Sequence, residues 1–278
     1  MVQADYSYLA NNYVDTLCVP AMYDDEISET YEDYILQGIT KVRDNIVLSA
    51  YDYTGKGYSI LYVMNSEGRL MRVINLGFKA HVGGLAYDED RDLLWITAAR
   101  GQVYALDWSA LARGDVVRPV YKFDAGLYNN YGSHVASFLA LDANKLYVGS
   151  YCVGCEGILN QYDIDELLGL NNTSPEYKYT IPEKVQGITF YHNESNGHKT
   201  LIMTQCAGVT SSHLLTVEMT SGKLDYEKPD TSEVIPAMVE QPLMTDEGLY
   251  LLFESSAQIY RNFYRVPNDQ IWLINYAQ

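Results

Sequence analysis

One pattern of apolar and polar positions recurs five times along the 278 residues of this chain. Each copy reads apolar, variable, small, apolar, variable, apolar, and it opens a run of residues with the composition of a β-strand. The first variable positions are spaced 46, 53, 50 and 54 residues apart, and they are occupied by Gln37, Gly83, Ala136, Gln186 and Glu240. A near-constant period of about 50 residues, built from strand-like units, predicts a repeat architecture.

Further strand-like runs follow each copy of this pattern. The second run is apolar and is expected at 46–50, 94–98, 146–150, 201–205 and 249–253. The third run alternates with a period of two, as a half-buried strand does, at 59–63, 102–106, 157–162, 213–217 and 270–274. The fourth run is expected at 70–76, 116–123, 177–182 and 231–236. Turn residues separate the runs, short helices are expected at 108–113 and 165–170, and residues 1–12 are expected to be loose.

Four antiparallel strands in about 50 residues are typical of a propeller blade, and the chain resembles the β-propeller superfamily over nearly its whole length. We expect an all-β fold in which a single domain, residues 1–278, forms a five-bladed β-propeller. The expected blades of four strands lie at about 35–77, 78–124, 133–182, 183–236 and 237–278. The last blade has three strands of its own, so we expect the strand at 13–19 to complete it and cover its open edge.

A short motif near the end of the sequence carries a closer resemblance. The Trp-Asp dipeptide of the best-known propeller repeats does not occur in this chain. Phe253-Glu254-Ser255-Ser256-Ala257, followed by Tyr260-Arg261, instead resembles a late motif of a loose group of secreted bacterial propellers of uncharacterised function. This resemblance implies a propeller fold and no particular activity.

The charge of the chain limits its partners. There are 36 acidic and 19 basic residues, for a formal net charge of −17. Binding to nucleic acid needs a basic footprint that releases counterions, so nucleic acid is not expected as a partner, and anionic membrane surfaces are disfavoured. No apolar run approaches the roughly 18 residues of a membrane span. A self-repelling, monomeric protein is the expected outcome.

The compartment follows less directly from the sequence. No charged segment followed by an apolar one opens the chain, as a signal peptide would. The protein is therefore either cytosolic or secreted, with the signal peptide absent from this sequence. We favour an extracellular or cell-surface protein, with which the acidic, Tyr-rich composition is compatible.

The four cysteines are Cys18, Cys152, Cys155 and Cys206. Cys152 and Cys155 form a C-x-x-C that follows a strand and opens no helix, which argues against a thioredoxin-like site. Cys152, Cys155 and Cys206 fall at second-strand ends of neighbouring blades. In a secreted protein a disulfide from Cys206 to Cys152 or Cys155 is the favoured interpretation, and free thiols are the alternative. A metal site made by all four is disfavoured, because Cys18 falls on an outer strand.

The repeat alignment predicts which polar residues meet. In a propeller blade the innermost strand comes first, so the start of the first strand and the end of the second lie beside the central channel on one face. The first-strand starts carry Gln37, His81, His134, Gln186 and Glu240. The second-strand ends carry Tyr51, Asp52, Arg100, Tyr151 and Glu254. Polar groups that converge in a concavity predict a ligand site at this mouth.

Two kinds of catalysis can be weighed against this ring. Glycoside hydrolysis needs two carboxylates that face each other. Five-bladed propellers that carry it place these on innermost strands, where this chain offers only Glu240, with Asp52 or Glu254 contributing from second strands. A divalent cation would find ligands in His81, His134 and Glu240 or Glu254, although no short-range ligand spacing supports such a site.

Binding without catalysis is the third option. The chain has 26 Tyr against 6 Phe and 3 Trp, and several of the Tyr residues are expected near the mouth: Tyr51, Tyr53, Tyr58, Tyr128, Tyr131 and Tyr151. Aromatic rings beside planar amides such as those of Gln37 and Gln186 suit sugars and protein partners. The residues of the ring differ from blade to blade, so we expect one asymmetric site and not five equivalent lectin sites.

We therefore predict a ligand-binding propeller with one site at the mouth of the central channel and no required cofactor. Its ligand is a glycan, another small polar molecule or a protein partner. The alternative is a hydrolase or lyase that uses the His and carboxylate residues of the mouth, with or without a divalent metal. The predicted site residues are Gln37, Tyr51, Asp52, His81, Arg100, His134, Tyr151, Gln186, Glu240 and Glu254.

Overall fold

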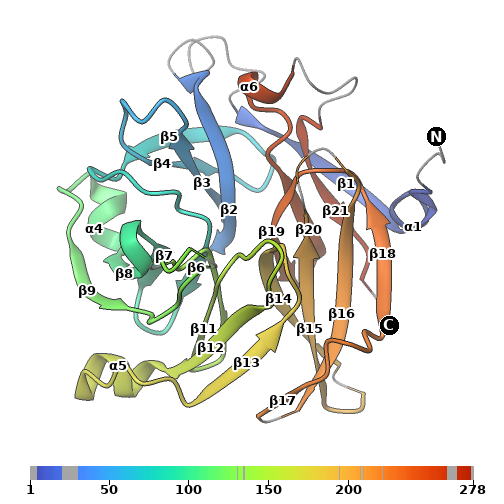
Figure 1. Cartoon of the computed structure of the whole chain (residues 1–278). Coiled ribbons are helices and arrows are strands. Elements are labelled where there is room, and N and C mark those ends of the chain that lie inside the picture. The colour runs from blue at the N-terminus through green and yellow to red at the C-terminus, as the bar shows by residue number, and fades with distance from the viewer. Residues whose placement is uncertain are drawn as a thin grey trace.

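The structure is a computed structural model that describes residues 5–20, 31–129, 131–133, 135–193, 195–206, 208, 210–220, 222–261 and 268–276. Five antiparallel sheets stand in a ring around one axis, as the five-bladed prediction requires (Figure 1). The innermost strands of the five blades contact one another in ring order: β2, β6, β10, β14 and β19. The expected propeller fold is therefore confirmed.

Each blade runs from the axis outward in chain order. Blade 1 contains β2 (Tyr34–Val42), β3 (Asn45–Asp52), β4 (Ile60–Met64) and β5 (Leu70–Asn75). Blade 2 contains β6 (Leu85–Asp88), β7 (Leu93–Thr97), β8 (Gln102–Asp107) and β9 (Pro119–Asp124). Blade 3 contains β10 (Phe138–Asp142), β11 (Lys145–Gly149), β12 (Gly157–Asp163) and β13 (Tyr177–Ile181).

The last two blades depart slightly from this plan. Blade 4 contains β14 (Val185–Asn193), β15 (His198–Gln205), β16 (Ser212–Thr220) and β18 (Thr231–Ile235), with the short β17 (Lys223–Leu224) paired to the end of β16. Blade 5 contains β19 (Val239–Thr245), β20 (Gly248–Phe253) and β21 (Gln270–Ile274). Its fourth strand is β1 (Tyr13–Cys18), which pairs antiparallel with β21, and this confirms the expected closure of the ring.

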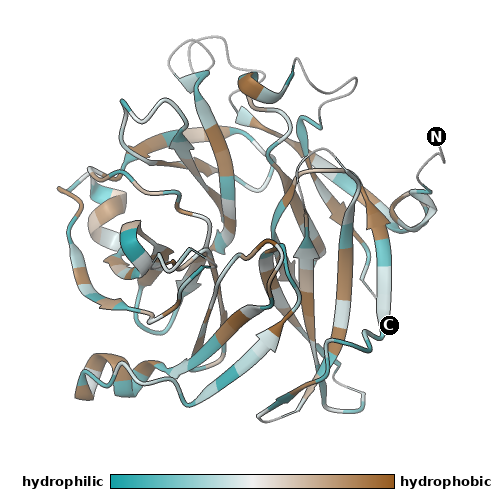
Figure 2. Ribbon diagram, in the orientation of Figure 1, coloured by the Kyte–Doolittle hydropathy of each residue, from teal (hydrophilic) through white to brown (hydrophobic). Residues whose placement is uncertain are grey.

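The hydrophobic core is divided into five clusters, one between each pair of neighbouring blades. Apolar residues occupy the strands, and polar residues lie mainly at turns and strand ends (Figure 2). Large side chains such as Trp95, Tyr147 and Phe253 are almost fully buried between sheets. Because both faces of most strands are covered by neighbouring blades, burial stabilises the ring as a whole.

Short helices fill the outer connections. The helices α4 (Trp108–Arg113) and α5 (Ile164–Leu170) confirm the two predicted from sequence, and the side chains of Asp107 and Asp163 cap their first turns. The helix α1 (Ser7–Asn12) replaces the loose segment expected there, because Leu9 is buried in the cluster between blades 4 and 5. Within the described residues, none of the helices has the length and apolar character that a membrane crossing requires.

Candidate functional site

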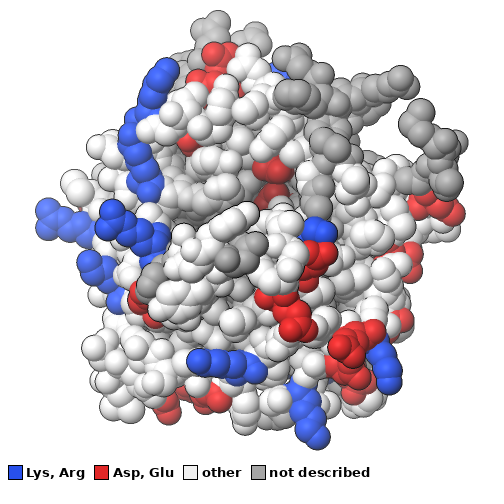
Figure 3. All heavy atoms as spheres, viewed as in Figure 1, with Lys and Arg blue, Asp and Glu red and all other residues white. Residues whose placement is uncertain are grey.

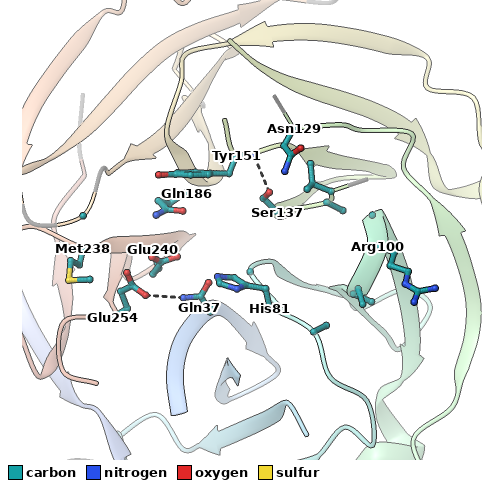
Figure 4. A pocket seen from close by; sticks show the side chains of 18 of the residues that line it. Gln37, His81, Arg100, Asn129, Ser137, Tyr151, Gln186, Met238, Glu240 and Glu254 are labelled. Carbon is teal, nitrogen blue, oxygen red and sulfur yellow. Dashed lines mark hydrogen bonds between the residues drawn. The ribbon is translucent and has the colours of Figure 1, made fainter. Parts of the chain in front are cut away.

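A cavity of about 770 Å³ opens at the end of the axis where the innermost strands begin. Seven of the predicted site residues line it: Gln37, His81, Arg100, Tyr151, Gln186, Glu240 and Glu254. They come from all five blades, and Figure 4 shows their side chains around one opening. The blade alignment made from the sequence therefore brought together side chains that are far apart along the chain.

Three of these residues reach the cavity through irregular strand pairing. The register between first and second strands shifts at Leu36/Gly38 in β2, at Val185/Gly187 in β14 and at Val239/Pro242 in β19. Gln37, Gln186 and Glu240 lie at these shifts. A β-bulge re-aims a side chain that regular pairing would direct between sheets. The bulges thus explain why the variable slot of the repeat faces the channel.

In blades 2 and 3 the segments before the first strand contain small residues and reach the channel without a bulge. Their first strands begin later, at Leu85 and Phe138, so the preceding residues lie outside regular pairing. A Cβ at Gly83 would approach the carbonyl oxygen of Ser137 to 2.1 Å, and one at Gly84 would approach the amide nitrogen of Leu139 to 2.3 Å. Glycine is required at both positions because the backbones of blades 2 and 3 meet there.

Gln241 crosses the channel beneath the cavity and lines a second cavity on the other side. Its side chain is 2% exposed and contacts the innermost strands of three other blades. Its Oε1 accepts hydrogen bonds from the backbone amides of Ile39 (3.3 Å) and Leu85 (2.9 Å), and its Nε2 donates to the carbonyls of Leu85 (2.7 Å) and Leu139 (3.3 Å). The second cavity has a volume of about 710 Å³, and the two cavities share no lining residue. The channel is therefore blocked at mid-height.

Sequence reasoning did not find Gln241, although the repeat contained a signal for it. The small slot of the pattern holds Gly38, Gly84, Ser137 and Gly187 in the first four copies and a glutamine in the fifth. A Cβ at Gly38 would lie 3.0 Å from Oε1 of Gln241, and one at Gly187 would lie 2.5 Å from its Cα. Glycines at these positions thus leave the space that the Gln241 residue occupies.

Glu240 and Glu254 form a pair of carboxyl groups on one wall of the cavity. Glu254 follows β20 directly, and its amide donates to the carbonyl of Met238, the residue before β19, which places it beside Glu240. Glu240 is 3% exposed, and its carboxyl makes no hydrogen bond with the described residues. Glu254 accepts a hydrogen bond of 3.2 Å from Nε2 of Gln37. Figure 4 shows both side chains directed into the same opening.

This environment favours the protonated form of the pair. Burial, with the nearby charge of Glu254, raises the pKa of Glu240 well above its ordinary value. Burial also raises the pKa of Glu254 to about 7, against the opposing effect of the hydrogen bond from Gln37. Two adjacent carboxyls titrate as one unit, so the pair retains a proton near neutral pH.

His81 lies beside Gln37 and packs on Tyr51. The two ring centroids are 4.2 Å apart with the planes tilted by 30°. The ring can be reached from the cavity, but the surrounding protein lowers the pKa of His81 below its ordinary value by desolvation, which favours the neutral imidazole. Tyr51 itself does not line the cavity, and burial raises the pKa of its hydroxyl. Its role in the structure is to support the His81 ring.

Blades 2, 3 and 4 form the rest of the cavity wall. The amide of Tyr151 donates to Oγ of Ser137 (2.9 Å), and the Tyr151 ring and the Gln186 side chain lie together in Figure 4. Arg100 lies in the 3₁₀ turn η1 (Ala99–Gly101) with a left-handed backbone, φ 61° and ψ 39°. Its guanidinium points away from Glu240 and Glu254 in Figure 4, so it does not neutralise them.

Other predicted site residues lie elsewhere. Asp52 does not line the cavity, because its carboxylate accepts hydrogen bonds from the amides of Thr54 and Gly57 and holds the loop that follows β3. His134 lies outside the described residues. Of the tyrosines expected near the mouth, Tyr53, Tyr58, Tyr128 and Tyr131 are exposed and do not line the cavity. Lining residues that the sequence did not indicate include Asn129, Met238, Ile259 and Tyr260.

The predicted disulfide is wrong in its pairing. Cys152 bonds to Cys155, with 5.6 Å between their Cα atoms, and Cys206 is a buried free thiol. The C-x-x-C loop folds back on itself after β11, so the two sulfurs meet within one blade. Burial raises the pKa of the Cys206 thiol, which makes it a poor nucleophile. Cys18 is free and exposed on β1, the outer strand of blade 5.

The second cavity, beyond Gln241, has a different character. Several of its side chains are paired across neighbouring blades: Lys41 with Glu247 (2.8 Å), Arg43 with Asp92 (3.1 Å), and His192 with Asp142 through a hydrogen bond (2.6 Å). These groups already have partners, unlike Glu240. Among the described residues no group of three or more His, Cys, Asp or Glu side chains is arranged to hold a metal ion.

Comparisons with known proteins show similarity in fold alone. A comparison with protein-family models gives no match, and a comparison with curated proteins gives none either. Among solved structures, the chain is similar to the Cps50 (Swd1) β-propeller domain of Myceliophteria thermophila, with 12% identity over 87% of this chain and 65% of that one, and a TM-score of 0.41. It is also similar to the WD40 β-propeller domain of Doa1, with 9% identity over 96% and 97% and a TM-score of 0.45.

A third similar structure is that of a nidogen/laminin complex, with 13% identity over 80% of this chain and 73% of that one and a TM-score of 0.44. The chain spans less than two thirds of the Cps50 domain it matches. At these identities the similarity concerns the fold alone. The fold by itself does not specify a function, so a functional argument has to start from the residues of the cavity.

Proposed function

We propose that this protein binds a small polar ligand, such as a glycan or a group presented by a partner protein, in the cavity above Gln241. The observation that supports this most directly is the convergence of polar side chains from all five blades on one opening. Glu240 and Gln186 make no side-chain hydrogen bond with the described residues, so they retain capacity for a ligand. Convergent polar groups in a largely apolar concavity are typical of ligand sites.

The asymmetry of the cavity favours a single ligand. Its carboxyl pair belongs to blade 5, its imidazole to blade 2 and its free amide to blade 4. The amide recurs as Gln37 on blade 1 and Gln186 on blade 4, but Gln37 already donates to Glu254, so a symmetric, multivalent ligand would not find equivalent contacts. The blocked channel supports the same conclusion, because a ligand enters and leaves through one mouth.

The test is a binding screen against a glycan and peptide panel, with Gln186→Ala as the first variant. We expect loss of the amide to weaken binding about tenfold, corresponding to roughly 1.4 kcal/mol for a lost hydrogen bond. Gln102→Ala is the matched control, since Gln102 lies on β8 and does not line the cavity. Equal affinities for Gln186→Ala and Gln102→Ala would place the ligand elsewhere.

One observation favours a hydrolase or lyase as the second candidate. A carboxyl pair that retains a proton near neutral pH can donate it as a general acid while its partner accepts one. If the site is catalytic, Glu240→Gln should abolish turnover of a panel of glycosides and acidic sugars and leave binding measurable. A metal scan of the purified protein tests the divalent-cation version, because a bound ion should be lost on replacement of His81 and Glu240.

Secretion is part of the same proposal. Disulfides persist mainly in oxidising compartments, so the Cys152–Cys155 bridge supports an extracellular or cell-surface location. The large negative net charge supports solubility at such a surface. Fractionation of the native source, with antibodies against the protein, checks this directly.

A further inference from the structure

The carboxyl pair lacks a positive partner. In the described lining of the cavity the one permanently cationic side chain is that of Arg100, and it extends away from Glu240 and Glu254 (Figure 4). On the face seen in Figure 3, acidic atoms lie in the central hollow, while most Lys and Arg side chains lie toward the periphery. A buried carboxylate is normally paired with a cation or a set of donors. Glu240 has neither among the described residues.

The other titratable groups near the pair do not supply that charge. Cys206 and the hydroxyls of Tyr51 and Tyr151 are close enough to interact electrostatically with it, and all three are neutral when protonated. His81 lines the same cavity, and its surroundings favour the neutral ring. Tyr260 also lines the cavity and interacts with Tyr51. None of these groups carries a positive charge near neutral pH.

Building on the proposed function, we propose that the cavity recognises a primary ammonium group, with Glu240 and Glu254 as its acceptors. An alkylammonium has three N–H donors and a positive charge, which are the two things the pair lacks. The remaining lining suits the alkyl part: Ala80, Ala98, Val135, Ala136, Met238 and Ile259 are apolar. Tyr151 and Tyr260 add aromatic rings, whose faces attract cations.

Charge complementarity extends beyond the cavity. The net charge of −17 attracts cations to the whole molecule, and the acidic hollow of Figure 3 focuses that attraction on the channel mouth. A neutral sugar would gain nothing from this field. The electrostatics therefore distinguish an amine from the other small polar ligands that the cavity can accept.

Binding of an ammonium group should displace the proton that the pair shares. The amine stays protonated up to a pH of about 10, as lysine does, so the change of affinity with pH comes from the protein. The pKa of Glu254 is raised to about 7, so Glu254 loses its proton between pH 6 and pH 8, and the affinity for the amine should rise about tenfold. Titrations at pH 7 in phosphate and in Tris should differ in heat by the ionisation enthalpy of the buffer multiplied by the protons released.

The experiment is isothermal titration of the protein with n-pentylamine, with 1-pentanol as the neutral probe of the same size. We expect the amine to bind at least tenfold more tightly than the alcohol at pH 8. Glu240→Gln should weaken binding of the amine about tenfold and leave binding of the alcohol unchanged. The control is Glu89→Gln, which removes the same charge at the second cavity beyond Gln241, where Glu89 is exposed.

Each outcome separates this inference from the proposed function. Equal binding of pentylamine and pentanol, or an equal effect of Glu240→Gln and Glu89→Gln on the amine, would overturn the ammonium site. If a neutral glycan from the panel then binds and Gln186→Ala weakens it, the proposed function stands with a different ligand class. Failure of every probe and of the panel would overturn both. Circular dichroism of each variant confirms that the propeller is intact.

Discussion

Replacing Gln241 with alanine should weaken the whole ring, because this one side chain ties four blades together. The change removes hydrogen bonds to two backbone amides and two carbonyls, and it leaves a void where Gly38 and Gly187 pack against the glutamine. A buried hydrogen bond contributes about 1 kcal/mol, and four would give about 4 kcal/mol. Water from the two mouths can restore part of this, so we expect a loss of about 3 kcal/mol.

For a domain of this size, such a loss lowers the melting temperature by about 6–10 °C. Differential scanning calorimetry and urea unfolding measure it. Gln186→Ala is the matched control, since that glutamine lies on an innermost strand and makes no side-chain hydrogen bond with the described residues; we expect it to melt within about 2 °C of the wild type. Gln241→Met keeps the volume and removes the polar contacts, which isolates their contribution. Equal melting temperatures for Gln241→Ala and Gln186→Ala would show that the Gln241 side chain does not hold the blades together.

Three other predictions concern the carboxyl pair, the thiols and the closing strand. Because the folded pKa of the pair is raised, the native state holds more protons than the unfolded state. The free energy of unfolding, measured with urea, should therefore fall by on the order of 3 kcal/mol from pH 4.5 to pH 7. The fall should be clearly smaller in Glu240→Gln. Iodoacetamide should label Cys18 in the native protein and Cys206 only after unfolding, as mass spectrometry of tryptic peptides will show, and rapid native labelling of both would contradict the structure. Deletion of residues 5–18 should expose the edge of β21 and abolish cooperative unfolding in calorimetry, whereas a retained sharp transition would show that β1 is dispensable.

The sequence was sufficient for the fold because one pattern controls every blade. A strand pattern repeated five times is compatible with few architectures. The extra strand at 13–18 precedes the first repeat, and blade 5 has three strands of its own with an open edge that β1 can pair with. The cavity followed from the same alignment, since Gln37, Gln186 and Glu240 occupy one slot of the repeat. What the alignment could not show is that bulges in β2, β14 and β19 turn that slot toward the axis.

Local interactions explain what the sequence did not reveal. Asp52 has the right position in the blade, but amides of its own loop satisfy its carboxylate first. Cys152, Cys155 and Cys206 lie on neighbouring blades as predicted. Cys152 and Cys155 are only three residues apart, so they meet each other before either can reach Cys206. Repulsion and burial of Glu240 beside Glu254 depend on side-chain placement within blade 5, which no spacing in the sequence encodes.

The closure of blade 5 sets an order of events during synthesis. Strand β1 is synthesised about 250 residues before its partner β21, and in the folded ring Cys18 lies opposite Gln270. At about 5–20 residues per second, β1 waits on the order of 10–50 s with its edge unpaired. The first four blades can stack during that interval, and the ring cannot lock until the last strand arrives. Until then the edge of β1 is open to pairing with other chains, and the free thiol of Cys18 lies on this unpaired strand.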